Sequence, residues 1–364
     1  MTKVQALYIH IPFCHSICAY CDFTRSLYNK EIVDKYLDCL KQELKEINTE
    51  NITTIYIGGG TPSTLTLQQL TFLFDSLQEI KNIKEFTIEV NPESLNQEKV
   101  QIFRQYGVNR VSLGVQSTNN KLLSLLQRKH NFDQVKSSVE LLKKCGIKNI
   151  SVDLMYSLPT QTMSDWQQSL QDIIKLDINH ISLYSLTIES GSCFGINDLK
   201  PLDSEIEEEM YFYAIDFLKS QGYHQYEVSN FARNNSESQH NLFYWRYANF
   251  YGIGLGASGK IDQKRYTNTT NILDYLNGIR KDIIINLTTE DEMFEYIMMN
   301  LRLKTGIDKK EFQYRFNMSI YDKYSNQLEN LIRNEQLVDV NTHIKATPKH
   351  FSLLNEILSE FLVQ

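Results

Sequence analysis

The sequence predicts an α/β protein in which strand and helix units form an incomplete (β/α)6 barrel, followed by a smaller, mainly helical C-terminal domain. Six apolar runs recur along the first half of the chain, and helix start and stop signals separate them. Because strands that are apolar throughout are buried on both faces, these runs favour a parallel sheet covered by helices. A doubly wound sheet fits the same pattern and stays open as an alternative.

The predicted strands and helices alternate along the chain. In chain order, the six strands lie in ALYIHIPF, TTIYIGGG, FTIEVNP, RVSLGVQS, ISVDLMYSLP and HISLYSLTIE. Thr66 and Ser164 are each followed three residues later by glutamine, as in a capping box, which predicts that helices begin there. Gly107 and Gly146 stand where two of the helices should end.

After the sixth strand the pattern changes. Residues 202–223 predict a helix with an acidic first turn, and YEVSN at 226–230 resembles a short strand. Residues 231–259, rich in Asn, Ser, Gly and aromatics, predict a long, wholly or partly ordered excursion, and helical periodicity resumes near residue 280. The expected units are a core at 1–235, a connecting segment at 236–280 and a C-terminal domain at 281–364.

The composition is that of a soluble globular protein. Hydrophobic residues make up 42% of the chain and charged residues 22%. The net charge of −7 argues against broad contact with nucleic acid. No apolar run approaches the ~20 residues of a membrane span, and the first residues lack a signal-peptide cleavage pattern. We therefore expect a cytoplasmic protein with no nucleic-acid partner.

Three of the six cysteines, Cys14, Cys18 and Cys21, lie within eight residues, in CHSICAYC. This clustering in a chain without a secretion signal favours a metal site over disulfides. Structural zinc usually has four ligands, whereas a 4Fe-4S cluster held by three cysteines leaves one iron open to another ligand. Because Phe23 stands where a fourth thiol would be sought, we expect a three-cysteine 4Fe-4S cluster, with zinc or a plain thiol cluster as the alternative.

Polar residues lie at or near the carboxyl ends of several predicted strands, where the loops of parallel α/β folds meet. Residues 58–61, GGGT, end the second strand, Glu89 and Gln116 lie near the ends of the third and fourth, and Asp153 lies within the fifth. A carboxylate flanked by apolar residues needs a partner or a ligand to offset its desolvation. We expect these residues to share one rim, although either carboxylate alone could be a cap or an ion-pair partner.

The segment CHSICAYC before a βα barrel, together with GGGTP after the second strand, resembles the radical S-adenosylmethionine (SAM) superfamily. The resemblance implies a radical SAM barrel with a 4Fe-4S cluster whose open iron is chelated by the amino and carboxylate groups of SAM. One electron from such a cluster cleaves SAM to a 5′-deoxyadenosyl radical. The glycines at 58–60 are suited to close approach of the backbone.

Seven further strings narrow the resemblance to the group of oxygen-independent coproporphyrinogen III oxidase, across nearly the whole chain. They are YIHIPFC, YIGGGTPS, EVNPESL, VSLGVQS, VDLMYSLPTQT, YEVSNFAR and EYIMMNLRLKTGID. Carried over by position, the cluster ligands are Cys14, Cys18 and Cys21, and the SAM contacts are Tyr8, Tyr20, Gly59, Gly60, Thr61, Glu89, Gln116, Arg128 and Asp153. The resemblance implies that Arg128 pairs with the methionine carboxylate and Asp153 with ribose hydroxyls. Core packing is the alternative for Tyr8 and Tyr20.

Two departures from authentic oxidases favour a sister group. Phe23 replaces a further cysteine, and only 13 residues precede Cys14, where the oxidases have a long amino-terminal extension. Both features resemble the radical SAM heme chaperones, which bind heme and pass it to acceptor proteins. HNLFYW at 240–245 matches the HNxxYW motif of that group. Its aromatics could stack on a porphyrin and His240 could ligate the iron, although a hydrogen-bonded structural role for His240 is the simpler alternative.

The leading expectation is therefore a heme chaperone with a 4Fe-4S cluster, exchangeable SAM and heme as its cofactors. Its expected partners are heme, a heme-acceptor protein such as a respiratory cytochrome, and a second copy of the chain, with peripheral membrane contact. The alternative is a true coproporphyrinogen III oxidase, in which the adenosyl radical takes hydrogen from a propionate side chain. A tRNA-modifying radical SAM enzyme is disfavoured by the acidity and by the C-terminal strings.

Overall fold

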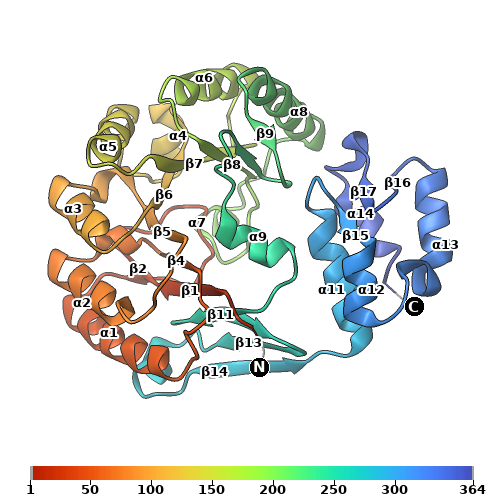
Figure 1. The fold of residues 1–364 in the computed structure, drawn as a ribbon. Helices are drawn as coiled ribbons and strands as arrows, with labels where there is room; N and C mark the ends of the chain where they lie inside the picture. The colour runs from red at the N-terminus through yellow and green to blue at the C-terminus, as the bar shows by residue number, and fades with distance from the viewer. Residues whose placement is uncertain (1–2, 363–364) are drawn as a thin grey trace.

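The computed structural model describes residues 3–362, and a twelve-stranded sheet forms its centre (Figure 1). Six neighbouring strands are parallel and follow chain order: β1 (Ala6–Ile11), β4 (Thr54–Gly59), β5 (Glu85–Val90), β6 (Arg110–Gln116), β7 (Asn149–Tyr156) and β8 (His180–Ser185). The six predicted strands are thus confirmed. No pairing between described strands closes the two ends of the sheet, so the barrel is incomplete.

Helices cover the outer face of these strands in an arc (Figure 1). The arc consists of α1 (Lys30–Lys45), α2 (Leu67–Leu77), α3 (Gln97–Gln105), α5 (Phe132–Lys144), α6 (Met163–Ile174) and α8 (Ser204–Ser220). Shorter elements lie in the loops: η1 (Pro62–Thr64), η2 (Pro92–Ser94), α4 (Asn120–Leu125) and α7 (Cys193–Ile196). The apolar strands meet the buried sides of the amphipathic helices in one large core, in which Ile9, Leu37 and Leu73 are buried.

The predicted helix ends are confirmed with one exception. Thr66 caps α2 in a capping box with Gln69, and the glycines at 107 and 146 follow α3 and α5 with positive φ angles of 84° and 86°. The predicted start at Ser164 is wrong, because Thr162 caps α6 in a capping box with Asp165. The Asp165 carboxylate accepts from the Thr162 backbone N–H at 2.9 Å, and Ser164 lies within the first turn.

The predicted strand at YEVSN is also wrong. The ladder strands lie on either side of its first four residues, as β9 (His224–Gln225) and β10 (Asn230–Ala232). Between them the chain turns around Glu227, which is fully buried and accepts from the Ser229 backbone N–H at 3.2 Å. The backbone here pairs instead with the segment after α11, because Glu227 forms an isolated antiparallel bridge with Leu303 and the Val228 N–H donates to the Arg302 carbonyl at 3.1 Å.

The excursion and the predicted connecting segment extend the sheet beyond β1. They contain α9 (Gln239–Trp245), β11 (Phe250–Ile253), β12 (Ser258–Ile261), β13 (Lys264–Asn268) and α10 (Ile272–Leu276). β11 is parallel to β1, and antiparallel strands follow it out to the edge strand β14 (Lys281–Asn286). The sheet therefore continues six residues past residue 280, the predicted end of the connecting segment.

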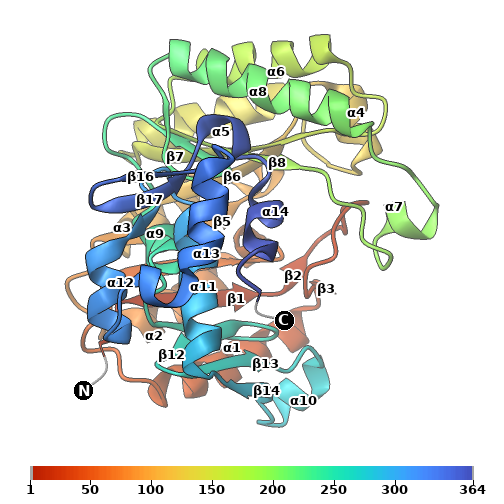
Figure 2. The ribbon, with the colours of Figure 1, turned by 90° about the vertical axis from the view of Figure 1, so that its right-hand side faces the viewer.

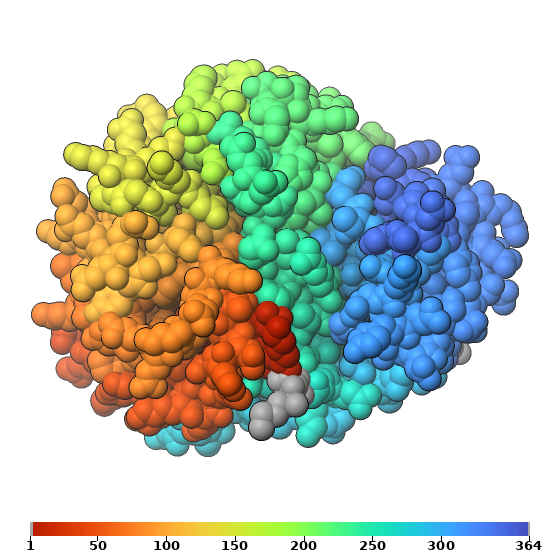
Figure 3. Space-filling model, viewed as in Figure 1, coloured from red at the N-terminus to blue at the C-terminus, as the bar shows by residue number. Residues whose placement is uncertain are grey.

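The C-terminal domain has its own core and stands beside the sheet (Figure 2). Its helices are α11 (Thr289–Leu301), α12 (Lys309–Phe316), α13 (Ile320–Arg333), η3 (Pro348–His350) and α14 (Leu354–Ser359). A small antiparallel sheet joins β15 (Ile307–Asp308), β17 (His343–Ala346) and β16 (Leu337–Val340). In the space-filling view the domain, drawn blue, packs against the middle of the chain, drawn green (Figure 3). Within residues 3–362, no helix is long and apolar enough to cross a membrane.

Candidate functional site

The cysteine loop leaves β1 at Pro12 and is held at both ends. Its first residues form β2 (Phe13–Cys14), which pairs in parallel with β3 (Ser26–Leu27). The Ser26 N–H donates to the Pro12 carbonyl at 2.6 Å, and the Tyr28 N–H to the Cys14 carbonyl at 2.9 Å. Residues 15–25 therefore form a closed loop at the carboxyl end of β1.

The loop brings its three cysteines to one cavity of about 380 Å³. Cys14 is buried, while Cys18 and Cys21 are partly buried. Burial raises the pKa of the Cys14 and Cys21 thiols, so each needs a metal or a cation to ionise readily. Among the described residues, no three His, Cys, Asp or Glu side chains converge closely enough to hold a single metal ion. A cluster differs from an ion in this respect, because each thiolate binds a different iron.

The glycines at the carboxyl end of β4 let the cysteine loop and a carboxylate pack closely against this strand end. A Cβ on Gly58 would lie 2.9 Å from Glu89 Oε1, and a Cβ on Gly60 would lie 3.0 Å from Cys14 Sγ. Gly59 has a φ of +121°, and a Cβ there would lie 2.7 Å from the His10 ring. The Gly60 N–H donates to the Ile11 carbonyl at 2.9 Å. The GGGTP segment thus holds the loop in place by close backbone packing.

Two carboxylates line the same cavity from β5 and β7, the strands on either side of β6. Glu89 accepts from the Tyr56 hydroxyl at 2.8 Å and from the Gly59 N–H at 3.0 Å. Both oxygens of Asp153 lie 3.1 Å from Ser112 Oγ. Burial raises the pKa of the Glu89 carboxyl to about 7, and burial also raises the pKa of Asp153. Both groups are therefore poised to bind a polar or cationic ligand group.

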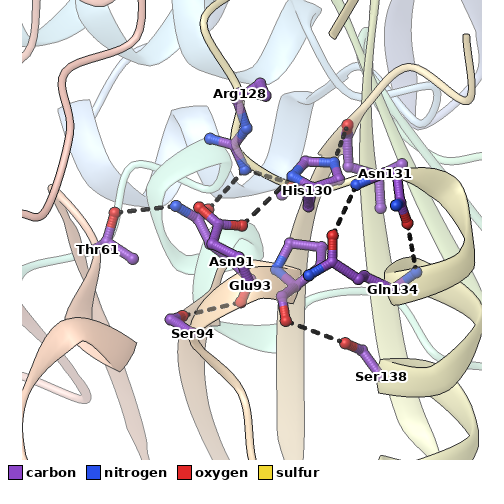
Figure 4. Close-up of polar contacts among 12 residues, drawn as sticks. Thr61, Asn91, Glu93, Ser94, Arg128, His130, Asn131, Gln134 and Ser138 are labelled. Carbon is purple, nitrogen blue, oxygen red and sulfur yellow. Dashed lines mark hydrogen bonds and ion pairs between the residues drawn. The ribbon is translucent and has the colours of Figure 1, made fainter. Parts of the chain in front are cut away.

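Arg128 lies between Cys18 and the loop after β5, and Figure 4 shows its hydrogen bond to Asn91 of that loop. Its Nη2 donates to Asn91 Oδ1 at 2.7 Å and to the Gly114 carbonyl at 2.6 Å, and its Nη1 lies 3.5 Å from Cys18 Sγ. Asn91 in turn donates to Thr61 Oγ1 at 3.2 Å, which lies 3.5 Å from Cys14 Sγ. Arg128 Nε is buried and has no hydrogen-bond partner among the described residues.

Glu93 and His130 form a second layer behind Arg128 (Figure 4). The His130 Nδ1 lies 3.4 Å from Glu93 Oε2, and its Nε2 lies 3.1 Å from the Val115 carbonyl. Burial raises the pKa of Glu93, but the hydrogen bond from His130 and the charge of Arg128 outweigh burial and hold that pKa below its usual value. A charged Glu93 helps to keep the buried guanidinium in place.

Gln116 and Tyr20 also line the cavity, whereas Tyr8 does not. Gln116 has a φ of +67° at a register shift near the end of β6, a strained conformation of the kind found at binding sites. The Tyr8 hydroxyl lies 2.8 Å from His10 Nδ1, and the Tyr8 ring packs beside the ring of Tyr56, which does line the cavity. The cavity therefore gathers eight of the nine residues predicted to contact SAM, and the contact of Tyr8 with SAM stays a prediction.

Sequence reasoning missed several polar lining residues, among them Asn91, Tyr56, Ser112 and Tyr184. Strand alternation could have found two of them. Tyr56 and Ser112 each lie two residues before a glycine at the strand end, so their side chains point to the face that carries the cavity. Asn91 carried no such signal, because an asparagine after a strand is usually a turn residue.

Phe23 lies at the rim of the cavity, and 63% of it is exposed. An exposed phenylalanine is uncommon outside contact surfaces. The side chain that stands in place of a fourth cysteine therefore faces solvent at the cavity mouth.

His240 lies elsewhere, fully buried on α9. Its Nδ1 is 2.9 Å from Thr54 Oγ1 and its Nε2 is 2.7 Å from the Tyr244 hydroxyl. Burial lowers the pKa of the imidazole to about 3, which keeps it neutral. Both ring nitrogens thus have partners, which favours the structural alternative. Heme ligation by His240 stays a prediction, and it would require one of these hydrogen bonds to break.

The donor set fits a cluster with a small polar ligand. Three thiols, two partly buried carboxylates and a partly buried guanidinium surround a cavity within the usual size range of ligand sites, about 300–1,000 Å³. The unpaired Nε of Arg128 offers a donor for a ligand carboxylate. The arrangement can hold an iron-sulfur cluster on one wall and a zwitterionic molecule on the other.

Two family models match the chain. The radical SAM superfamily matches residues 8–173, and the HemN C-terminal domain matches residues 287–352. The first match covers the cysteine loop and five of the six parallel strands, and the second covers most of the C-terminal domain.

Curated relatives match along the whole chain. The heme chaperone HemW of Lactococcus lactis is 38% identical, covering 100% of this chain and 98% of the relative. The proteins of the same name from Bacillus subtilis and Escherichia coli are 35% and 31% identical, covering 99% of this chain and 99% and 98% of the relatives. The solved structure of coproporphyrinogen III oxidase (HemN) from Escherichia coli has the same fold, with a TM-score of 0.87 at 22% identity over 99% of this chain and 90% of the oxidase.

Proposed function

Because the chain belongs to the HemW family of radical SAM heme chaperones, we propose that it binds heme and passes it to acceptor proteins. The observation that carries this proposal is the sequence identity of 31–38% with HemW proteins over practically the full length of both chains. The exposed Phe23 at the cavity mouth supports it, because the resemblance associates a further cysteine at this position with the oxidases.

In the proposed protein, Cys14, Cys18 and Cys21 hold a 4Fe-4S cluster. When bound, such a cluster supplies an open iron and one electron for SAM. Arg128 would pair with the ligand carboxylate through its free Nε, and Asn91 would keep its guanidinium in place. Glu89, Gln116 and Asp153 would bind the remaining polar groups, Asp153 those of the ribose.

The acceptor is proposed to be a heme protein such as a respiratory cytochrome. Peripheral contact with the membrane would follow from such an acceptor, and a homodimer follows from the family resemblance. These three proposals share one requirement: heme must be held where an acceptor can reach it.

The test is a reconstitution with three readouts: heme retention, heme transfer and coproporphyrinogen turnover. The protein is loaded anaerobically with iron and sulfide, mixed with heme and freed of unbound heme, and the heme retained per chain is measured. The loaded protein is then mixed with a heme-free acceptor, and coproporphyrinogen turnover is assayed in parallel. Retained and transferable heme without turnover is expected. Turnover without retained heme would overturn the proposal in favour of the oxidase alternative.

A further inference from the structure

A second cavity of about 220 Å³ lies between the extended sheet and α11, and it shares no lining residue with the cysteine cavity. We call it the Tyr244 cavity, because Tyr244 of the HNLFYW segment lines it. The motif therefore reaches this cavity through its tyrosine, whose hydroxyl bonds His240, while the histidine itself stays buried.

The walls of the Tyr244 cavity are aromatic and aliphatic. The rings of Tyr244 and Phe250 pack edge to face, with centroids 4.5 Å apart. On the edge strand β14, Ile283 and Ile285 also line the cavity, yet they remain 50% and 43% exposed. Isoleucines exposed beside an apolar cavity are the usual mark of a surface that something apolar covers. The cavity and the two side chains form one continuous apolar strip.

Two cationic side chains, those of Arg265 and Lys260, also line the Tyr244 cavity. Arg265 is half exposed and uses its Nε for Glu295 Oε1 at 3.0 Å. Lys260 is buried with its Nζ 4.1 Å from the centroid of the Tyr247 ring. A guanidinium fixed through its Nε still presents its outer N–H groups to a carboxylate. Glu295 also lines the cavity, so the site combines a flat apolar wall with an ion pair whose guanidinium has outer N–H groups to spare.

Two methionines also contribute to the walls of the Tyr244 cavity. Met298 and Met299 of α11 both line the cavity. A thioether is a ligand for heme iron and also packs well against a flat ring system. Apolar walls, a cation and a thioether are together the groups that suit a flat apolar macrocycle with carboxylate substituents and a central iron.

Resting on the heme chaperone function proposed above, we propose that the Tyr244 cavity receives one edge of heme, with Met298 or Met299 as the iron ligand and Arg265 pairing with a propionate. The cavity is smaller than the ~300 Å³ lower end of whole-ligand sites, so it encloses one edge only. The remaining face of the macrocycle lies over Ile283 and Ile285, open to solvent and to an acceptor.

The edge strand itself supplies a matched control. Successive strand residues point to opposite faces, so Ile284 faces away from Ile283 and Ile285. It is 59% exposed and does not line the cavity. Ile285→Asp and Ile284→Asp therefore place the same charge on the same strand, on the cavity face and on the opposite face.

The experiment titrates hemin into the cluster-loaded full-length protein and its variants. Ile285→Asp is expected to weaken heme binding by about tenfold or more, since it removes apolar contact and desolvates a charge. Ile284→Asp should bind within about twofold of wild type. Cluster content and thermal midpoint, measured for both variants, show that each is folded and loaded.

The outcomes separate the two proposals. If wild type binds no heme, the chaperone function itself fails. If wild type binds and Ile285→Asp binds equally well, the Tyr244 cavity is excluded while the chaperone function stands. If Ile284→Asp weakened heme binding as much as Ile285→Asp, the proposal that heme binds at the Tyr244 cavity would also be overturned. As a second measurement, the double variant Met298→Leu, Met299→Leu should change the absorption spectrum of bound heme yet keep its affinity for metal-free protoporphyrin. An unchanged heme spectrum would contradict the proposal that a methionine thioether ligates the iron.

Discussion

His240 Nε2 lies 2.7 Å from the hydroxyl of Tyr244, one helical turn further along α9. The other ring nitrogen bonds Thr54 at the start of β4, and the backbone N–H of His240 donates to the buried Glu85 at 2.9 Å. These bonds fix α9 to the amino ends of two barrel strands. The histidine of the HNLFYW segment therefore orients Tyr244 toward its cavity.

His240→Ala tests whether this histidine is structural. We expect the free energy of unfolding to fall by about 2–4 kcal/mol, because buried partners lose their hydrogen bonds and a cavity is left. In folded protein, the spectrum of bound heme should not change on adding imidazole. Denaturant titration and heme spectra provide the two readouts.

The exposed His224, in the same part of the chain, supplies the control for His240. His224→Ala should change stability by less than about 0.5 kcal/mol. If His240→Ala lost the heme spectrum and free imidazole restored it, the structural role would be refuted and iron ligation by His240 established.

The three cysteines at the cavity can be separated from the others by substitution. Replacing Cys14, Cys18 or Cys21 singly by serine should abolish the reconstituted cluster, because each thiolate binds its own iron. Iron and sulfide per chain and the visible absorption of the cluster measure this effect. Cys39→Ser is the matched control, since Cys39 packs against the core on α1, and it should keep full cluster content. A fully loaded Cys21→Ser protein would contradict the three-cysteine site.

The six parallel strands could be predicted from sequence because each strand is apolar along its length and most of the helices between them carry local end signals. The helix start predicted at Ser164 was wrong because Thr162 and Asp165 form a competing capping box two residues earlier. The carboxylate of an acid bonds the cap backbone more strongly than the amide of a glutamine does. The prediction at YEVSN was wrong because Glu227 pairs with Leu303 in an isolated bridge, a long-range contact that no local pattern predicts. Local patterns compete at such points, and the tertiary context decides.

Long-range features were less accessible to sequence reasoning. β11 pairs with β1 across most of the barrel sequence, and no local pattern encodes that pairing. The site was predictable where a strand end carries a charged or glycine residue, as at Glu89. Asn91 was missed because its role depends on Arg128 and Thr61, which approach it only in the folded chain.

Asn91→Ala should weaken SAM binding by about tenfold, because Arg128 loses a hydrogen bond that costs about 1–3 kcal/mol to leave unmade in a buried site. Asn91→Asp keeps the acceptor for Arg128 but loses the donor to Thr61, so its SAM affinity should fall less. Equilibrium binding of SAM to the loaded protein measures both. Asn96→Ala, which removes the exposed cap of α3, should lower stability and leave SAM affinity unchanged. Equal loss in Asn91→Ala and Asn96→Ala would refute the positioning role.

Glu89 should make the stability of the unloaded protein depend on pH. Its usual pKa is 4.5, and burial raises the pKa to about 7 in the folded chain. Between these values the folded state binds more protons than the unfolded state, so the free energy of unfolding falls as pH rises from about 4.5 to 7. Glu89→Gln carries no charge and should lack this contribution, roughly 3 kcal/mol at pH 8.

The comparison of wild type with Glu89→Gln is needed because burial also raises the pKa of Glu227 to about 7, so wild type alone reports both carboxyls. Urea titrations at pH 5 and pH 8 give the free energies of unfolding. The advantage of Glu89→Gln over wild type should be larger at pH 8 than at pH 5, because only wild type must bury a charge at the higher pH. An equal difference at both values would mean that Glu89 is ionised throughout, and its carboxylate would then already be charged before any ligand binds.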